Sequence, residues 1–351
     1  MGDFLLRVLF WHLVPSVTAA LFTFGFLILV LRLLKVRQPN WQYWVFLIPL
    51  LKAAAVLVLG AQLPPTLSTT KPLMIVSMLW DPFQVLSVPS ALEPLLPPVQ
   101  SSAAAIMATG AVLVFLCALL WRWGSLVLFY HRLDDSEELR KQDAPRVFQL
   151  LDRLVPKMAT PYPKVIVSDR DYVFPCTLGV VHPVIVLSPE LIELSSDEVL
   201  ESMLAHELAH WKRHDNIIHW ASVLLRDLLF FNPVAHLIFS RVLLAKETDC
   251  DRRAVRASGK PEALADAILF ASLQMSRKNL APLPGSLSGL GSHIFRGPLA
   301  KKRIHILKET LQMEKRRAWA GALLVVIAIL ALLVHIRVFV VAVTPPLVLQ
   351  F

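Results

Sequence analysis

Long apolar runs flank a charged middle section in this chain. Three runs without Asp, Glu, Lys or Arg cover Val8–Leu31, Ala103–Trp121 and Ala318–Ile336. Each is close to or longer than the roughly 20 helical residues that cross a hydrocarbon core of about 30 Å. Tyr43–Gln62 forms a fourth run if Lys52 at its centre is tolerated, because a buried partner or the interface can accommodate such a charge. The pattern therefore predicts four transmembrane helices.

The section between the third and fourth runs carries most of the charge and is predicted to be a water-soluble domain. With 351 residues, 56% of them hydrophobic, and a mean hydropathy of +0.59, the chain as a whole is too apolar for an ordinary soluble protein. The expected division is a first transmembrane helix in 1–37, a second in 38–62, an extracytoplasmic link in 63–102, a third helix in 103–130, the soluble domain in 131–317, a fourth helix in 318–337 and a short tail in 338–351.

The positions of Lys and Arg predict the orientation. The first run is followed by Arg32, Lys35 and Arg37, and the fourth is preceded by Lys315–Arg317. The link between the second and third runs contains no Lys or Arg except Lys71. Since cytoplasmic flanks are enriched in these residues, both termini are expected outside and the soluble domain in the cytoplasm, as in a bacterial inner membrane. The net charge of +9 follows from this asymmetry and from contact with anionic lipids, so a nucleic-acid partner is not expected.

The stretch "LSSDEVLESMLAHELAHWKRHD" predicts a helix with an HExxH motif. It begins with Ser195 and Glu198 in capping-box spacing and contains no Gly or Pro. On a helix, His206 and His210 lie on one face, where both imidazoles can bind one Zn²⁺. Glu207 is then placed to act on a water at the metal, which is the chemistry of a zinc protease.

A third ligand has to come from another helix. A third histidine that follows a glycine turn is excluded, since Arg213 occupies the position of the glycine and Asn216 that of the histidine. His214 lies about 12 Å along the helix axis from His206, which is too far to bind the same ion on a straight helix. The later stretch "SRVLLAKETDCDRRAV" offers Glu247 and Asp251 on one helix face. The first can bind the metal and the second can hold the outer nitrogen of a ligating histidine. Two His and one Glu leave a position open for water, as in catalytic zinc sites.

Four motifs in this order resemble the M56 peptidases, which are integral-membrane metalloproteases typified by the β-lactam sensor-transducers. The motifs are "LGVVHPVIVLSPEL", "HELAH", "FNP" and "KETDCD". The resemblance implies an α-helical membrane protein with a cytoplasmic, mainly-α, zincin-like α+β metalloprotease domain. It also implies that His206, His210 and Glu247 bind zinc, that Glu207 is the general base and that Asp251 supports a ligand. Only 14 residues follow Arg337, so antibiotic sensing is not carried over.

Two short β-branched runs, "KVIVSD" and "PVIVLS", predict strands. Val184–Leu187 is expected at a sheet edge beside the zinc helix, where an extended substrate could add as another strand. The apolar segment Asn216–Phe239 is interrupted by Arg226 and Asp227 and is expected to form a helical hairpin at the cytoplasmic face of the membrane. Four further histidines without spaced partners are expected to be solvated or hydrogen-bonded rather than ligands, namely His219, His236, His293 and His305.

The predicted activity is zinc-dependent hydrolysis of a peptide bond at the cytoplasmic face. The substrate is a protein, either a cytoplasmic repressor or the chain itself in the Pro/Gly/Ser-rich segment Asn279–Pro298, which composition alone indicates as a linker. Two alternatives stay open at this point. One is an M48-like membrane protease of quality control or of prenylated tails, and the other is a non-proteolytic transducer in which zinc only stabilises the domain.

Overall fold

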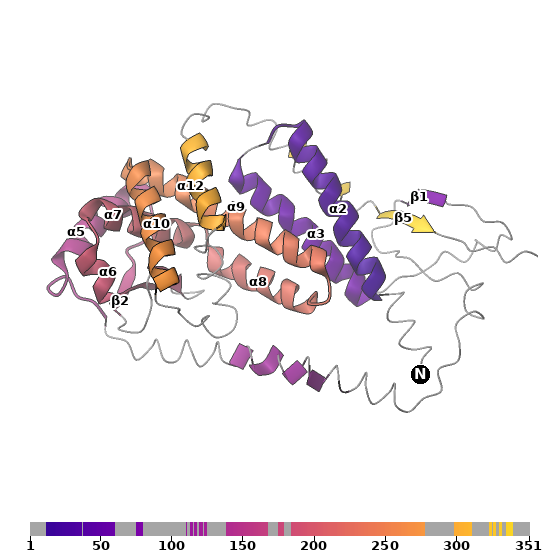
Figure 1. Ribbon diagram of the computed structural model, residues 1–351, viewed down its shortest axis with the longest axis horizontal. Helices are drawn as coiled ribbons and strands as arrows, with labels where there is room; N and C mark the ends of the chain where they lie inside the picture. The colour runs from indigo at the N-terminus through magenta and orange to yellow at the C-terminus, as the bar shows by residue number, and fades with distance from the viewer. Residues whose placement is uncertain are drawn as a thin grey trace, which may run out of the picture.

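Helices dominate the computed structural model of this chain, and a small sheet lies at the end remote from the two most apolar helices (Figure 1). The structure describes residues 12–36, 38–59, 75–79, 138–167, 175–178, 184–277, 298–310 and 335–339, with single helical positions within 110–124 and 323–331. Most of the third and fourth predicted spans, and the segment 279–297 with its predicted cleavage site, lie outside the described residues.

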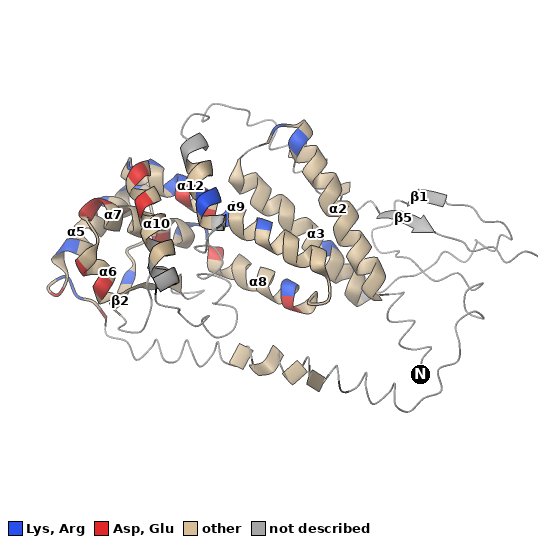
Figure 2. Cartoon of the chain, in the orientation of Figure 1, with Lys and Arg blue, Asp and Glu red and all other residues tan. Residues whose placement is uncertain are grey.

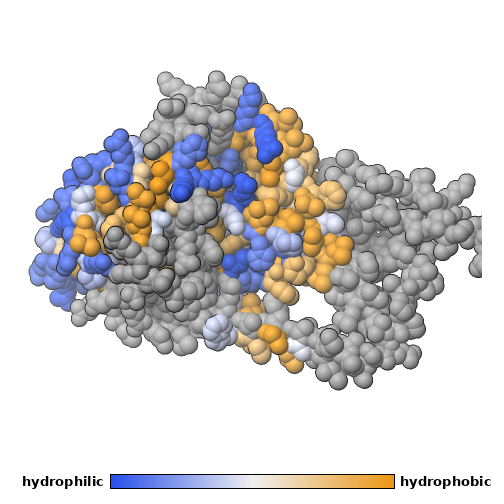
Figure 3. Space-filling model, viewed as in Figure 1, coloured by the Kyte–Doolittle hydropathy of each residue, from blue (hydrophilic) through white to orange (hydrophobic). Residues whose placement is uncertain are grey.

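Two long apolar helices, α2 (Val14–Leu33) and α3 (Pro39–Leu59), pack against each other. Windows of 20 residues in each, with mean hydropathies of 2.2 and 1.6, are long and apolar enough to cross a membrane. This confirms the first two predicted spans as helices, each displaced by a few residues from its predicted bounds. Apart from Arg32 near the end of α2, their large outward side chains are apolar (Figure 3), namely Val14, Leu21, Phe22, Phe26, Leu29, Leu33, Trp44, Leu51 and Val58.

Lys52, the one charged residue within the second span, is buried with a partner. Its ammonium donates a hydrogen bond to the carbonyl oxygen of Ala331 at 2.8 Å, in the predicted fourth span. Of the two expectations for this residue, burial against a neighbouring segment is therefore the one observed.

A helical hairpin connects the apolar helices to the rest of the fold. It consists of α8 (Asp215–Leu228) and α9 (Pro233–Ser258), as the interrupted apolar segment predicted. The "FNP" motif starts α9, because the Asn232 side chain accepts hydrogen bonds from the backbone N–H groups of Val234 and Ala235, while Pro233 needs no such partner. Gly259, with φ of 72°, ends the helix.

Helix α9 belongs to two hydrophobic cores. Ala235, Ile238 and Val242 in its first half pack with α2 and α3. Cys250 and Ala254 in its second half pack in the core of the charged domain, which is the predicted soluble domain 131–317. The helix is about 39 Å long at 1.5 Å per residue. Any residue near its middle, including Glu247, therefore lies where the apolar helix pair meets the charged domain (Figure 2).

The sheet of the charged domain corrects one prediction. Its strands β2 (Lys164–Val167), β3 (Cys176–Leu178) and β4 (Val184–Leu187) are ordered β2-β4-β3, with β2 parallel and β3 antiparallel to β4. Both predicted strands are confirmed, but the expectation that Val184–Leu187 is an edge strand is wrong. Three consecutive buried residues, Ile185–Leu187, mark a strand covered on both faces, as a central strand is. The strand beside the HExxH helix is β3.

Five more helices are seen in the described part of the charged domain: α5 (Pro145–Met158), α6 (Pro189–Leu194), α7 (Asp197–Lys212), α10 (Pro261–Arg277) and α12 (Pro298–Thr310). Helix α7 carries the HExxH motif, as predicted, but its N-cap is Ser196, whose side chain accepts from the backbone N–H of Val199. Ser195 instead ends α6, so the predicted capping box with Glu198 does not form. Beyond this domain, β1 (Ile75–Leu79) pairs antiparallel with β5 (His335–Phe339), a pairing that the sequence did not suggest.

Candidate metal centre

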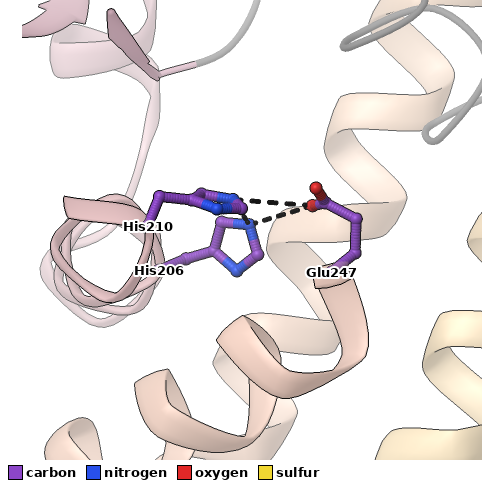
Figure 4. Close-up of side chains that lie close together, drawn as sticks. All are labelled: His206, His210 and Glu247. Carbon is purple, nitrogen blue, oxygen red and sulfur yellow. Dashed lines mark hydrogen bonds and ion pairs between the residues drawn. The ribbon is translucent and has the colours of Figure 1, made fainter. Parts of the chain in front are cut away.

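Three side chains from α7 and α9 converge on one point (Figure 4). The Nε2 atoms of His206 and His210 are 3.1 Å apart, and they lie 3.3 Å and 3.7 Å, respectively, from Oε2 of Glu247. Two ligand atoms of a tetrahedral zinc ion, each at about 2.0–2.1 Å from the metal, are about 3.3–3.4 Å apart. The spacing of these three atoms therefore fits a zinc ion bound by the residues that the sequence predicted.

The surroundings of the two outer ring nitrogens also fit a cation at this point. Nδ1 of His206 lies 3.0 Å from Oδ1 of Asp251, and Nδ1 of His210 lies 2.9 Å from Oδ2 of Asp215. When the imidazoles are neutral, a carboxylate beside Nδ1 keeps the ring proton on that nitrogen, which leaves the lone pair at Nε2. Two imidazole lone pairs and a carboxylate oxygen that face one another repel unless a cation lies between them. The donor set is therefore chemically suited to a divalent metal.

Charges around Glu247 keep this ligand anionic. Burial would raise the pKa of its carboxyl, but the nearby Lys246 ammonium and His210 outweigh burial and hold the pKa well below its usual range. Lys246 Nζ lies 3.3 Å from Oε1, which leaves Oε2 directed at the histidines. Burial alone would lower the pKa of His206, yet the carboxylates of Asp251 and Glu247 raise it to about 9. The centre thus stabilises positive charge.

Asp215 is a supporting residue that the sequence reasoning missed. The HExxH helix ends at Lys212, and His214 takes a left-handed backbone conformation with φ of 53°. This break turns Asp215 back toward His210. On a continuous helix, Asp215 would lie about 140° around the axis and 7.5 Å along it from that histidine. The sequence does show an aspartate shortly after the HExxH motif. Asp215 reaches His210, however, only because the helix is interrupted at His214.

Other side chains hold Asp215 in place. The Arg213 guanidinium donates from Nε to Oδ1 at 3.0 Å, and the Cys250 thiol donates to Oδ2 at 3.3 Å. His210, Asp215 and Cys250 also lie close enough together to bind a metal as a separate group. In this structure their atoms contact one another instead: the Cys250 thiol donates to Asp215, and the same Asp215 oxygen faces Nδ1 of His210.

Glu207 is oriented by the sheet. The Thr177 hydroxyl on β3 lies 2.8 Å from Oε2 of Glu207 and 3.1 Å from its backbone oxygen, and both residues are buried. This contact fixes the orientation of the carboxylate of the predicted general base. Thr177 was not predicted, because β3 is only three residues long and the sequence does not indicate which strand lies against α7.

No other histidine in the described part of the chain joins the centre. His214 is exposed at the turn before α8, which does not support it as an alternative ligand. Nε2 of the exposed His236 donates a hydrogen bond to the Phe230 carbonyl at 3.0 Å, as expected of a hydrogen-bonded histidine. His219 differs from its prediction, since it is buried and neither ring nitrogen has a hydrogen-bond partner among the described residues. Trp220 and Phe239 pack around its ring.

Comparison with known proteins agrees with this geometry. The family described as BlaR1 peptidase M56 matches residues 12–284, which include both apolar helices and the whole candidate metal centre. The chain belongs to the M56 peptidase family. The resemblance seen in the sequence motifs is thereby confirmed, and an M56 peptidase with two helices suited to a membrane is a membrane protein of the protease class.

The relatives of this M56 protein are named as regulatory, resistance and protease proteins. It is 35% identical to the regulatory protein BlaR1 of Bacillus licheniformis over 77 residues, which are 22% of this chain and 13% of BlaR1. It is 24% identical to a protease HtpX homolog of Salinibacter ruber over 245 residues, 57% of this chain and 88% of that protein. The methicillin resistance mecR1 protein of Staphylococcus aureus is 24% identical over 175 residues, 47% of this chain and 30% of mecR1.

Proposed function

We propose that this M56 protein is a zinc-dependent endopeptidase that hydrolyses peptide bonds at the cytoplasmic face of a membrane. The observation that carries the proposal is the convergence of His206, His210 and Glu247 on one point, with Glu207 next to His206 on the same helix. Among the described residues, no fourth His, Cys, Asp or Glu joins this group. Three protein ligands with one position left for water are the pattern of catalytic rather than structural zinc sites.

The metal supplies electrophilic chemistry to this site. When bound, Zn²⁺ polarises the carbonyl of the scissile bond and lowers the pKa of a water from near 16 to about 7. Glu207 accepts the proton of the attacking water and passes it to the leaving amine, which is the role of a general base and then a general acid. Thr177 keeps the Glu207 carboxylate in the orientation for this transfer. Asp251 and Asp215 hold the two imidazoles with Nε2 directed inward.

The cytoplasmic location rests on the Lys and Arg residues that flank the apolar runs. The substrate is a protein segment that reaches the boundary between the apolar helices and the charged domain. A cytoplasmic repressor and the chain's own segment Asn279–Pro298 are the two candidates, and the second is directly testable because it is present in the same molecule. Both candidates make the enzyme a regulatory protease.

Two other functions are less well supported. In a non-proteolytic transducer, zinc would only stabilise the domain, and the buried carboxylate of Glu207 in the HExxH motif, held by Thr177, would have no catalytic role. An M48-like quality-control or prenyl-protein protease would use the same chemistry, but the family match is to M56. The proteolytic reading accounts for more of the observed residues.

The substrate can be found by comparing proteomes. Cells that express the parent protein and cells that express Glu207→Gln at the same level should differ in the abundance of specific protein fragments. The matched control is Glu262→Gln, which changes an exposed carboxylate on α10. Fragments that depend on Glu207 but not on Glu262 identify substrates. Identical fragment patterns in all three cell lines, with zinc bound to each protein, would support the transducer instead.

A further inference from the structure

A fully buried arginine reaches the metal centre from a helix that the family match does not include. Arg303 lies on α12, beyond the matched residues 12–284, and is 1% exposed. Its neighbours Lys301 and Lys302 are exposed, so in sequence Arg303 is one of three cations in an apparently solvated basic run. Helix α12 packs against α9 and α10, which turns this single cation inward (Figure 1).

The guanidinium of Arg303 binds the carboxylate of Asp251 with two parallel hydrogen bonds. Nε donates to Oδ2 at 2.9 Å, and Nη2 donates to Oδ1 at 2.6 Å. Nη1 lies 3.6 Å from Oε2 of Glu247, the oxygen that faces both histidines. Since such bidentate contacts fix both distance and plane, Arg303 determines where the Asp251 carboxylate lies.

One oxygen of Asp251 connects Arg303 to a predicted zinc ligand. Oδ1 accepts from Arg303 Nη2 and lies 3.0 Å from Nδ1 of His206. When His206 binds metal as a neutral imidazole, the ion pair with Arg303 compensates the negative charge of Asp251. A buried carboxylate without such a cation carries a large desolvation cost. Arg303 therefore has both a geometric and an electrostatic effect on His206.

We propose that Arg303 is a positioning residue of the metal centre, which acts through Asp251 to orient His206 and makes α12 part of the site. The inference rests on the proposed zinc-dependent function, because it concerns the affinity of the same centre. It predicts that the metal affinity of a site built from α7 and α9 depends on a side chain about 50 residues further along the chain.

The test measures zinc affinity by chelator competition in the purified full-length protein. Arg303→Met should weaken zinc binding by about 10- to 100-fold, the usual range for a group that supports a ligand. Arg303→Lys should lie between this variant and the parent, since one ammonium cannot bridge both oxygens of Asp251 as the guanidinium does. Lys301→Met, which removes an exposed cation from the same helix, should bind zinc as the parent does.

A double-variant cycle separates positioning from a general structural effect. If Arg303 acts through Asp251, the double variant that combines Asp251→Asn and Arg303→Met should bind zinc no more weakly than the single variant Asp251→Asn. This pair also removes both buried charges, so it tests the inference even if Arg303→Met alone does not fold. Parent-like affinity in Arg303→Met and Arg303→Lys, or fully multiplicative losses in the double variant, would overturn the inference while the zinc site stands. Absence of zinc binding by the parent would instead refute the proposed function.

Discussion

His210 and Asp215 face each other at 2.9 Å across the break between α7 and α8. The break places the aspartate behind the second histidine of the HExxH motif, just as Asp251 lies behind the first. Each predicted zinc-binding imidazole therefore has its Nδ1 atom fixed by a buried carboxylate, one from the turn after α7 and one from α9.

Asp215→Ala should weaken zinc binding by about 10- to 100-fold, because His210 loses the carboxylate that fixes its orientation and raises its basicity. Competition with a chelator measures this effect. Asp266→Ala, which removes an exposed carboxylate from α10, is the matched control and should leave affinity unchanged. If Asp215→Ala binds zinc as tightly as Asp266→Ala does, then the contact with His210 has no role in metal binding.

Glu247→Ala should lose most of the bound zinc, because it removes a direct ligand rather than a supporting group. Elemental analysis of purified protein gives the metal content. Glu262→Ala on α10 controls for loss of one carboxylate at an exposed position. Equal zinc content in Glu247→Ala and the parent would mean that the third ligand is a different residue.

Thr177→Val should reduce peptide hydrolysis by about 10- to 100-fold without loss of zinc, since a hydrogen bond to a charged group contributes about 1.5–3 kcal/mol. Thr177→Ser keeps the hydroxyl beside Glu207 and should retain most of the activity. Rates of substrate cleavage and zinc content are measured for both variants. Equal rates in the Val and Ser variants would show that this hydroxyl does not orient the general base.

Reporter fusions test the predicted orientation. A reporter that works only outside the cytoplasm should be active when fused after Phe351 and inactive when inserted near Gly285, because Lys and Arg flank the predicted cytoplasmic domain. A cytoplasmic reporter should give the opposite pattern. Activity with the two positions exchanged would place the metal centre on the outer side and contradict a cytoplasmic substrate.

Local signals in the sequence were sufficient to predict the HExxH helix, its partner helix and the convergence of His206, His210 and Glu247. The two histidines and Glu207 share one regular helix, so helical periodicity alone relates their positions. Glu247 and Asp251 were found because their four-residue spacing marks one face of a second helix. Apolar runs likewise predicted α2, α3 and the hairpin, since length and hydropathy belong to each segment independently.

Features that depend on tertiary contacts could not be predicted in this way. The orientation of Asp215 depends on a left-handed residue at His214, which is neither glycine nor asparagine. Thr177 acquires its contact from the strand order, and the same order makes β4 central where an edge was expected. Arg303 belongs to a run of three basic residues, and only the packing of α12 on α9 determines which of the three is buried.

The most direct test of the account is the Glu207→Gln variant of the purified full-length protein. Gln keeps the size of the side chain and cannot accept the proton, so zinc content and folding should match the parent while cleavage slows by at least 10²- to 10⁴-fold. The measurement is the cleavage rate of an identified protein substrate, or of the chain's own segment Asn279–Pro298, at equal zinc occupancy. A zinc-loaded Glu207→Gln protein that cleaves at the parent rate would contradict the assignment of the HExxH helix as the catalytic element.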